Sequence, residues 1–389
     1  MIIPYGRQDI TQQDIDAVVA VLRSDFLTQG PQVPLFEQKV GDYCGVKHAV
    51  AFNSATSALH LACLALGLGP GDRLWTSPIT FVASANCGLY CGASVDFVDI
   101  DPNSFNLNPQ KLQAKLEVAR AANSLPKVVV STHMCGQPCD MRRIHALGKE
   151  YGFAIIEDAS HAIGARYLGE PVGNCHYSDI TIFSFHPVKI VTTAEGGVAC
   201  TNDPGLARRM ELLRSHGITR DSDQMREPAH GPWYYEQQAL GYNYRMTELQ
   251  AALGNSQLDR LDEYVAARHR LAGRYDDLLG ELPVCLPEQH ADGYSAFHLY
   301  VVRLQEADPQ QLLRTHNQMR SAGVLVNLHY IPVPIQPFYR DLGFEPNDWP
   351  MALDYYQRAI TLPLFAMMTE EQQNQVVRVL AGALQEIGT

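Results

Sequence analysis

DITIFSFHPVKIVTTAEGG, residues 179–197, runs from an apolar stretch into a turn-rich segment that contains a lysine. FAIIED, residues 153–158, lies before it and also ends in a polar side chain. Short apolar runs bounded by turn residues are typical of buried strands. Ligands of open α/β sheets lie beyond the carboxyl ends of the strands, so Asp158, Ser184 and Lys189 are the first candidates for a functional site.

The same pattern extends on both sides of these two runs. From about residue 47 to residue 202, the apolar runs HAVAF, RLWTS, SVDFVDI, KVVVST and GVACT alternate with helical patterns. Strands that alternate with helices predict a mainly parallel, doubly wound sheet. After residue 287, AFHLYVVRL and VLVNLHYI resemble strands, and helical patterns over 309–322 and from 370 onward predict a smaller α+β lobe. Near the start, Thr11 precedes an amphipathic helix in which Ile15, Val18, Val19 and Leu22 share a face.

Composition excludes several classes of protein. The chain has 389 residues, which favours two domains, and a formal net charge of -12, which offers no basic surface for nucleic acid or acidic membranes. There is no apolar run of 18 or more residues, so no membrane partner is expected. A cytoplasmic location is expected instead. The pairs Cys87/Cys91 and Cys135/Cys139 have CxxxC spacing, unlike most structural zinc pairs, so no metal is expected.

Lysine usage singles out Lys189. Lysine occurs only at positions 39, 47, 111, 115, 127, 149 and 189, so Lys189 is the sole lysine after residue 149. Arginine supplies the other positive charges of the second half, but a guanidinium cannot replace a primary amine that forms an imine. The alternative is a solvated lysine, and the flanking strand ends favour the functional interpretation.

Pyridoxal phosphate needs an imine-forming amine, an anion at its ring nitrogen, a flat neighbour and phosphate donors. Asp158 can supply the anion, although a strand-end turn carboxylate is the alternative. NSATS, residues 53–57, precedes an apolar helix, so its amides and hydroxyls offer a helix N-terminus to a phosphate, or a plain N-cap. Ser184 adds a hydroxyl, and Phe81 can stack on the ring unless it belongs to the core.

Seven segments, in this order, resemble one known family: SATSALHLA, PITFVASAN, EDASHAIGA, SFHPVKIVTTAEGG, LRSHGI, GYNYRMTELQAALG and NLHYIPV. The chain resembles the DegT/StrS sugar aminotransferases, which are fold type I pyridoxal-phosphate enzymes, over nearly its whole length. The resemblance implies an aspartate-aminotransferase-like α/β fold with a large domain around a mainly parallel seven-stranded sheet over residues 1–255. It further implies a small C-terminal α+β domain over residues 256–389.

The resemblance also implies roles for individual residues. Lys189 would carry the cofactor as a Schiff base and move the proton, and Asp158 would pair with the pyridine nitrogen. Further expected cofactor contacts are Ala55, Thr56 and Ser184 at the phosphate, Phe81 on the ring, and Asn243 reaching the phosphate of a partner subunit. The residues that match sugar-nucleotide contacts are Tyr5, Asp25, Phe26, Leu27, Thr28, Asn327, Leu328, His329 and Tyr330.

Two positions depart from the wider family. Many members have glycine in place of Ala55 and glutamine in place of His161, whereas the altrosamine-forming branch resembles this chain at both. His161 is therefore expected to contact the cofactor, with a satisfied core histidine as the alternative. Relatives that dehydrate sugars have histidine in place of Lys189, so dehydration is not expected.

The implied reaction is transfer of an amino group from L-glutamate to C4 of a UDP-linked 4-keto-6-deoxy-N-acetylhexosamine by a homodimer with shared active sites. Pyridoxamine phosphate would be the intermediate form of the cofactor, and the product would be UDP-4-amino-4,6-dideoxy-N-acetyl-β-L-altrosamine, a precursor of pseudaminic acid. A UDP, GDP or dTDP sugar of another kind remains an alternative. GLGPG, residues 67–71, weakly suggests a nicotinamide oxidoreductase, but it does not match GxGxxG. A non-catalytic protein on the same fold is the third hypothesis for the function.

Overall fold

A seven-stranded sheet forms the centre of the computed structural model, which describes residues 2–306 and 308–385. Its order is β2-β10-β9-β6-β5-β3-β4. The strands are β2 (His48–Phe52), β3 (Arg73–Thr76), β4 (Ser94–Phe97), β5 (Val128–Thr132), β6 (Ala154–Asp158), β9 (Ile180–Ser184) and β10 (Gly197–Thr201). Only β10 runs antiparallel to its neighbours, so the prediction of a mainly parallel, doubly wound sheet is confirmed.

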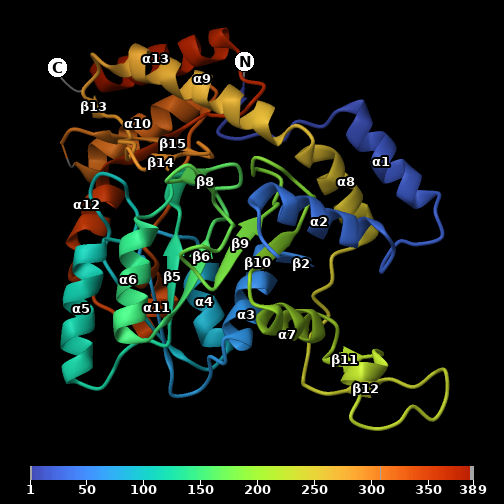
Figure 1. The fold of residues 1–389 in the computed structure, drawn as a ribbon. Helices are drawn as coiled ribbons and strands as arrows, with labels where there is room; N and C mark the ends of the chain where they lie inside the picture. Colours follow the sequence, from blue (N-terminus) through green and yellow to red (C-terminus); the bar gives the residue numbers. More distant parts are fainter. Residues whose placement is uncertain (1, 307, 386–389) are drawn as a thin grey trace.

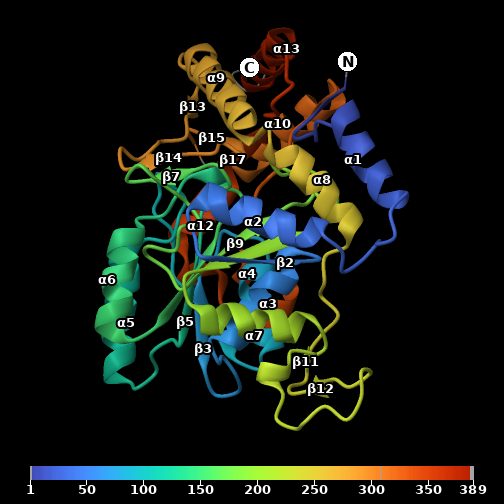
Figure 2. The same cartoon turned by 45° about the vertical axis from the view of Figure 1, so that its right-hand side comes forward.

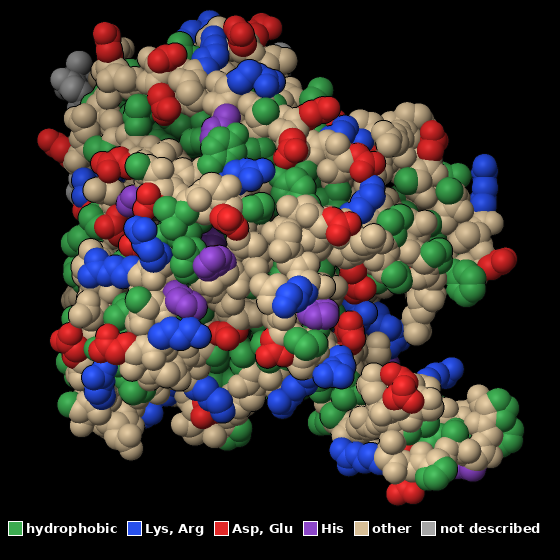
Figure 3. All heavy atoms as spheres, in the orientation of Figure 1, with side chains coloured by type: hydrophobic (Ala, Val, Ile, Leu, Met, Phe, Trp, Pro, Cys, Tyr) green, Lys and Arg blue, Asp and Glu red, His purple; other side chains and the backbone are tan. Residues whose placement is uncertain are grey.

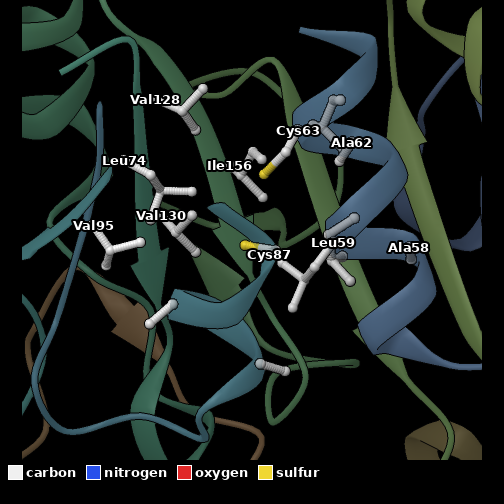
Figure 4. Close-up of a cluster of buried hydrophobic side chains, with 14 of the residues drawn as sticks. Ala58, Leu59, Ala62, Cys63, Leu74, Cys87, Val95, Val128, Val130 and Ile156 are labelled. Atoms are coloured by element: carbon white, nitrogen blue, oxygen red, sulfur yellow. The ribbon is translucent and has the colours of Figure 1, made fainter. Parts of the chain in front are cut away.

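Helices cover both faces of this sheet (Figures 1 and 2). One face packs against α3 (Ala55–Ala65), α4 (Ala83–Tyr90) and α7 (Pro204–Arg214). The other packs against α5 (Pro109–Ala121) and α6 (Met141–Tyr151), and further along against α2 (Gln32–Cys44) and α8 (Glu248–Leu258). Side chains alternate along each strand, so Ile155 lies toward α5 and α6 whereas Ile156 packs beneath α3 and α4 (Figure 4).

The smaller lobe is built on a three-stranded antiparallel sheet of β13 (Val284–Cys285), β15 (Tyr300–Leu304) and β17 (Ala359–Leu362). Its helices are α9 (Leu261–Leu279), α10 (Pro309–Ser321), α12 (Pro350–Arg358) and α13 (Glu370–Gln385). The N-terminal strand β1 (Ile3–Pro4) pairs with β16 (Val324–Leu325), which ties the chain's start to this lobe. The division at residues 255 and 256 stays a prediction.

Shorter elements connect these layers. They are β7 (Arg166–Tyr167), β8 (Glu170–Pro171), β14 (Gly293–Tyr294), α11 (Pro337–Asp341), η1 (Met134–Gly136), η3 (Val333–Ile335) and η4 (Pro346–Asp348). The predicted strand VLVNLHYI is shorter than expected, because only Val324–Leu325 forms a strand ladder. Its later residues leave the sheet, and His329 and Tyr330 line a cavity instead.

The first helix, α1 (Gln12–Leu22), begins at the predicted place, with Thr11 and Asp14 forming a capping box. Part of its apolar face is open, however, since Ile15 and Leu22 are 46% and 58% exposed, whereas Val18 and Val19 are half-buried. Asp14 lies on the buried side, and its carboxylate forms a salt bridge with Arg260, in which Nη2 lies 2.7 Å from Oδ2. α1 therefore packs on α8 with Asp14 and Val21 buried, and leaves Ile15 and Leu22 uncovered in the single chain.

Residues 217–241 form a segment that stands away from the body (lower right in Figures 1 and 3). It holds β11 (Ile218–Thr219), η2 (Ser222–Gln224) and β12 (Glu236–Gln237). Trp233 and Leu240 are 72% and 82% exposed on it. Elsewhere on this face, basic and acidic side chains are interspersed (Figure 3). In the part of the chain that the structure describes, no helix has the length and apolar character to cross a bilayer.

Candidate active site

A cavity of about 420 Å³ lies beyond the carboxyl ends of β6 and β9. Ten of the residues predicted from the sequence line it: Tyr5, Ala55, Thr56, Phe81, Asp158, His161, Ser184, Lys189, His329 and Tyr330. They come from both lobes, from the start of the chain and from four separate loops of the large sheet. The structure thus brings together groups that are far apart in the sequence.

Lys189 lies in the loop between β9 and β10. This loop folds back on itself, because Lys189 N donates to His186 O at 2.9 Å and Thr193 N donates to Phe185 O at 2.9 Å. Burial lowers the pKa of the Lys189 amine to about 8, and the charge of Asp158 partly offsets this shift. A fraction of the amines is therefore neutral near pH 7, and a neutral amine is the form that attacks an aldehyde.

Asp158 ends β6 on the face that packs beneath α3 and α4. Its Oδ2 accepts a hydrogen bond from Ser84 Oγ at 2.5 Å, and its Oδ1 accepts one from Ser160 N at 3.1 Å. Ser84 is in turn hydrogen-bonded to Thr80, at 2.7 Å, in the buried layer above the sheet. These donors hold the orientation of the carboxyl group.

The N-terminus of α3 opens into the same cavity. Ser54 caps the helix by accepting from Ser57 N at 3.1 Å, and Ala55 and Thr56 begin the first turn at the cavity wall. Amides of a first helical turn lack intrahelical acceptors and favour an anion. A Cβ on Gly197 would lie 2.5 Å from Ala55 N, so only glycine lets β10 approach this turn. With the hydroxyls of Thr56 and Ser184, the turn fits a phosphate group.

Aromatic and imidazole side chains form the opposite wall. Phe81 is 56% exposed, and its ring centroid lies 6.2 Å from that of Tyr330. Burial and the charge of Lys189 lower the pKa of His161 well below its usual value and that of His329 to about 3. These imidazoles are neutral at physiological pH.

Several lining residues were not singled out from the sequence. They are Leu59, Thr80, Ala83, Thr132, Ser160, His186, Val188, Glu195 and His298. Each lies within or beside a run quoted above, and for all but His298 that run belongs to the large sheet or to the segments that follow its strands, so their closeness to the site had a sequence signal. His298 had none, because it comes from the small lobe and reaches the cavity only through packing between the lobes.

Seven predicted residues do not line this cavity. Asn243 is exposed on the surface and forms an isolated bridge with Ser215. The segment 25–28 lies outside, with Phe26 and Leu27 about half exposed, and Asn327 and Leu328 lie beside His329 without reaching the cavity. Among the described residues, no three His, Cys, Asp or Glu side chains form a group that could hold a metal ion.

The residues present fit pyridoxal phosphate. A cavity with a reactive amine, a hydrogen-bonded carboxylate, a helix N-terminus and a flat aromatic side chain, set at the edge of this sheet, defines the aspartate-aminotransferase-like class of pyridoxal-phosphate enzymes. Over residues 8–381 the sequence matches the DegT/DnrJ/EryC1/StrS aminotransferase family. The chain belongs to this family and is a sugar aminotransferase that depends on pyridoxal phosphate.

Three relatives resemble it over most of their length. The spore coat polysaccharide biosynthesis protein SpsC of Bacillus subtilis is 38% identical, covering 97% of this chain and 96% of the relative. GDP-perosamine synthase of Caulobacter vibrioides is 38% identical over 89% and 88% of the two chains. UDP-4-amino-4,6-dideoxy-N-acetyl-beta-L-altrosamine transaminase of Campylobacter jejuni is 36% identical over 99% and 98%.

Solved structures agree with this family. PseC of Helicobacter pylori, an aminotransferase involved in pseudaminic acid biosynthesis, superposes with a TM-score of 0.90 at 30% identity, covering 99% of this chain and 100% of that one. Spr1654 of Streptococcus pneumoniae in its PMP-form gives a TM-score of 0.90 at 29% identity with the same coverage.

Proposed function

We propose that this enzyme transfers an amino group from L-glutamate to C4 of a UDP-linked 4-keto-6-deoxy-N-acetylhexosamine, UDP-2-acetamido-2,6-dideoxy-β-L-arabino-hex-4-ulose. The product would be UDP-4-amino-4,6-dideoxy-N-acetyl-β-L-altrosamine, which serves pseudaminic acid synthesis. The observation that carries the chemistry is the Lys189 amine, partly neutral and half-buried, in one cavity with Asp158 and a phosphate-fitting helix N-terminus.

Each residue has a distinct task in this proposal. Bound pyridoxal phosphate supplies an aldehyde that links to an amine and a ring that withdraws electrons from the adjacent carbon. Lys189 Nζ holds the cofactor at rest, and once displaced it takes a proton from the donor's carbon and later delivers one to C4 of the sugar. Asp158 keeps the ring nitrogen protonated, and Thr56, Ser184 and the α3 amides hold the phosphate. The two substrates would then react in turn, with ping-pong kinetics.

The choice of sugar rests on likeness to relatives. The altrosamine transaminase covers 99% of the chain, and PseC has the same fold at 30% identity. A second candidate is a GDP-linked 4-keto sugar, because GDP-perosamine synthase is 38% identical over a somewhat shorter span. Both substrates are nucleotide-linked sugars with a ketone at C4, so the same catalytic groups serve either one.

A substrate panel separates the two candidates. Purified enzyme with L-glutamate would be offered UDP-, GDP- and dTDP-linked 4-keto-6-deoxy sugars, and the formation of 2-oxoglutarate and of aminated product would be followed. We expect kcat/KM for the UDP-linked arabino-hexulose to exceed that for the others by at least about tenfold, and the new C4 amine to have the altro configuration. A higher kcat/KM for the GDP-linked sugar would reject the UDP assignment and leave the aminotransferase assignment intact.

We further propose a homodimer with shared active sites. Asn243 lies on the surface between two stacked tyrosines, Tyr242 and Tyr244, whose ring centroids are 4.9 Å apart. Asn53, just before the phosphate-fitting turn, donates from its backbone N to Tyr244 O at 2.9 Å, which fixes this stretch. Asn243 is therefore well ordered yet does not line its own chain's cavity, as expected for a residue that serves a second copy. The exposed segments 24–28 and 217–241 supply apolar surface for the contact.

Mixed dimers test this sharing. We expect Lys189→Ala and Asn243→Ala to be impaired alone, whereas co-expressed chains should recover about a quarter of wild-type activity, since half of the random dimers would hold one intact site. The measurement is kcat per total chain of the unselected co-expressed mixture; mixed dimers selected with two different tags should reach about half of wild-type activity, because each holds one intact site of two. Activity no higher than the sum of the two single variants would show that Asn243 serves its own chain.

The cytoplasmic location stays a prediction.

A further inference from the structure

His161 is held between two other side chains at the cavity wall. The residue is 5% exposed, and its Nε2 lies 3.1 Å from the Tyr330 hydroxyl. The planes of the two rings differ by 23°. On its other side, the His298 ring centroid is 4.5 Å away. His161 thus has one ring nitrogen engaged and little freedom to rotate.

The position of His298 depends on close backbone contacts between the lobes. Ala296 N donates to Gly136 O at 3.0 Å, and a Cβ on Gly136 would lie 3.1 Å from His298 N. The buried Arg268 donates from Nη1 to His298 O at 3.0 Å and to Phe297 O at 3.1 Å. These contacts hold His298 against His161, so the wall is rigid.

The hydrogen bond between Tyr330 and His161 determines which ring nitrogen of His161 carries the hydrogen. Burial raises the pKa of Tyr330, so its phenol stays protonated, and among the described residues His161 is its only hydrogen-bond partner. If His161 Nε2 carried the hydrogen, both the partly buried phenol O–H and the buried Nδ1 lone pair would lack partners among the described residues. If Tyr330 donates, only His161 Nδ1 is unpaired. Unpaired buried groups are unfavourable, so the second arrangement is preferred.

The same surroundings keep His161 neutral. The charged and titratable groups that face it are Lys189, His298, His329 and Tyr330, with Asp158 nearby. Burial and Lys189 both disfavour a second proton on the ring. A second proton on Nε2 would also displace the hydrogen bond from Tyr330.

His161 Nδ1 is buried and has no partner within the described residues. We propose that Tyr330 holds His161 as a neutral imidazole with its proton on Nδ1, and that this N–H donates to an oxygen of the bound cofactor. Tyr330 is then a positioning residue, and His298 supports the ring from behind. The donation to cofactor rests on the proposed use of this cavity; the location of the proton on His161 does not.

A double-mutant cycle tests the coupling. Tyr330→Phe keeps the ring but lets His161 exchange tautomers, so we expect the apparent dissociation constant of pyridoxal phosphate to rise about fivefold to tenfold, the effect of one neutral hydrogen bond. In the His161→Gln background the same change should have an effect within about twofold, because an amide NH₂ always donates. Tyr339→Phe, which removes the buried bond to Asn86 outside this cavity, should leave cofactor affinity unchanged. Equal effects of Tyr330→Phe in both backgrounds would overturn the proposal.

Neutron diffraction gives an independent readout. A deuterated crystal of the full-length holoenzyme should show deuterium on His161 Nδ1 and on the Tyr330 oxygen, and Tyr330→Phe should place part of the deuterium on Nε2. Deuterium only on Nε2 of the wild-type His161, or on both nitrogens, would reject the tautomer. If the chain bound no pyridoxal phosphate, the proposed function would fail, while the tautomer could still be decided on the cofactor-free chain.

Discussion

Lys189→Ala is expected to abolish transamination, with kcat falling by at least about 10⁴-fold, the upper end of what one positioned proton-transfer group contributes. The physical reason is that the variant would lose the amine that we propose as both the covalent anchor of the cofactor and the base that moves the proton. Lys189→Arg should fail as well, since a guanidinium neither forms the imine nor gives up its proton. The measurement is single-turnover formation of 2-oxoglutarate from L-glutamate.

A covalent readout complements the kinetics. Borohydride should bleach the visible band of the wild-type holoenzyme and add the mass of the reduced cofactor to the peptide that contains Lys189. Lys149→Ala, at an exposed lysine on α6, is the matched control and should retain full activity and labelling. Label on another lysine, or near-normal turnover of the Lys189→Ala variant, would contradict the assignment.

Asp158→Asn is expected to lower kcat by about 10²- to 10³-fold, comparable to the loss of one preorganised electrostatic group. Asparagine keeps the size of the side chain; its oxygen can accept from Ser160 N, and its NH₂ can donate to Ser84 Oγ, so the fold should persist. Without the negative charge, however, the variant would lack the group that we propose to keep the pyridine nitrogen of bound pyridoxal phosphate protonated, and the ring would withdraw electrons less strongly. Single-turnover rates and the visible spectrum of the holoenzyme measure this effect.

The neighbouring Glu157 provides the control. It lies on the other face of β6, where its Oε2 is 2.7 Å from His133 Nε2 and its Oε1 accepts from Ser178 and Thr181. Glu157→Gln should reduce Tm but leave kcat and the visible band within about twofold, because side chains alternate between faces. An equal loss of kcat in the two variants would show that the effect of Asp158→Asn comes from damage to the strand end.

The residues at the sheet edge were predictable because each follows an apolar run directly. Asp158, Ser184 and Lys189 lie at or just after the ends of β6 and β9, and neighbouring parallel strands bring their carboxyl ends to one edge. Local sequence also placed the start of α3 and hence Ala55 and Thr56 at a helix N-terminus. Phe81 was proposed from the sequence as a stacking side chain, whereas Tyr5, His161, His329 and Tyr330 reached the list through family resemblance. The structure places all five at the cavity.

Other features had no local signal. α1 buries Asp14 against Arg260 and leaves Ile15 and Leu22 exposed, and residues 246 positions apart cannot be paired from periodicity. Likewise, the strand pattern of VLVNLHYI is overridden where His329 and Tyr330 turn into the cavity.

The amino-acid sequence alone determined the type of sheet, the reactive amine, its carboxylate and the phosphate-fitting turn, because strand ends and helix starts are set by neighbours in the chain. Only the tertiary structure decided that His298 joins the cavity, that His161 has one unpaired nitrogen, and that Asn243 lies outside its own site. The physical reason is that these properties arise from contacts between segments far apart in the chain, such as Gly136 against the 296–298 backbone, and no local pattern encodes such contacts.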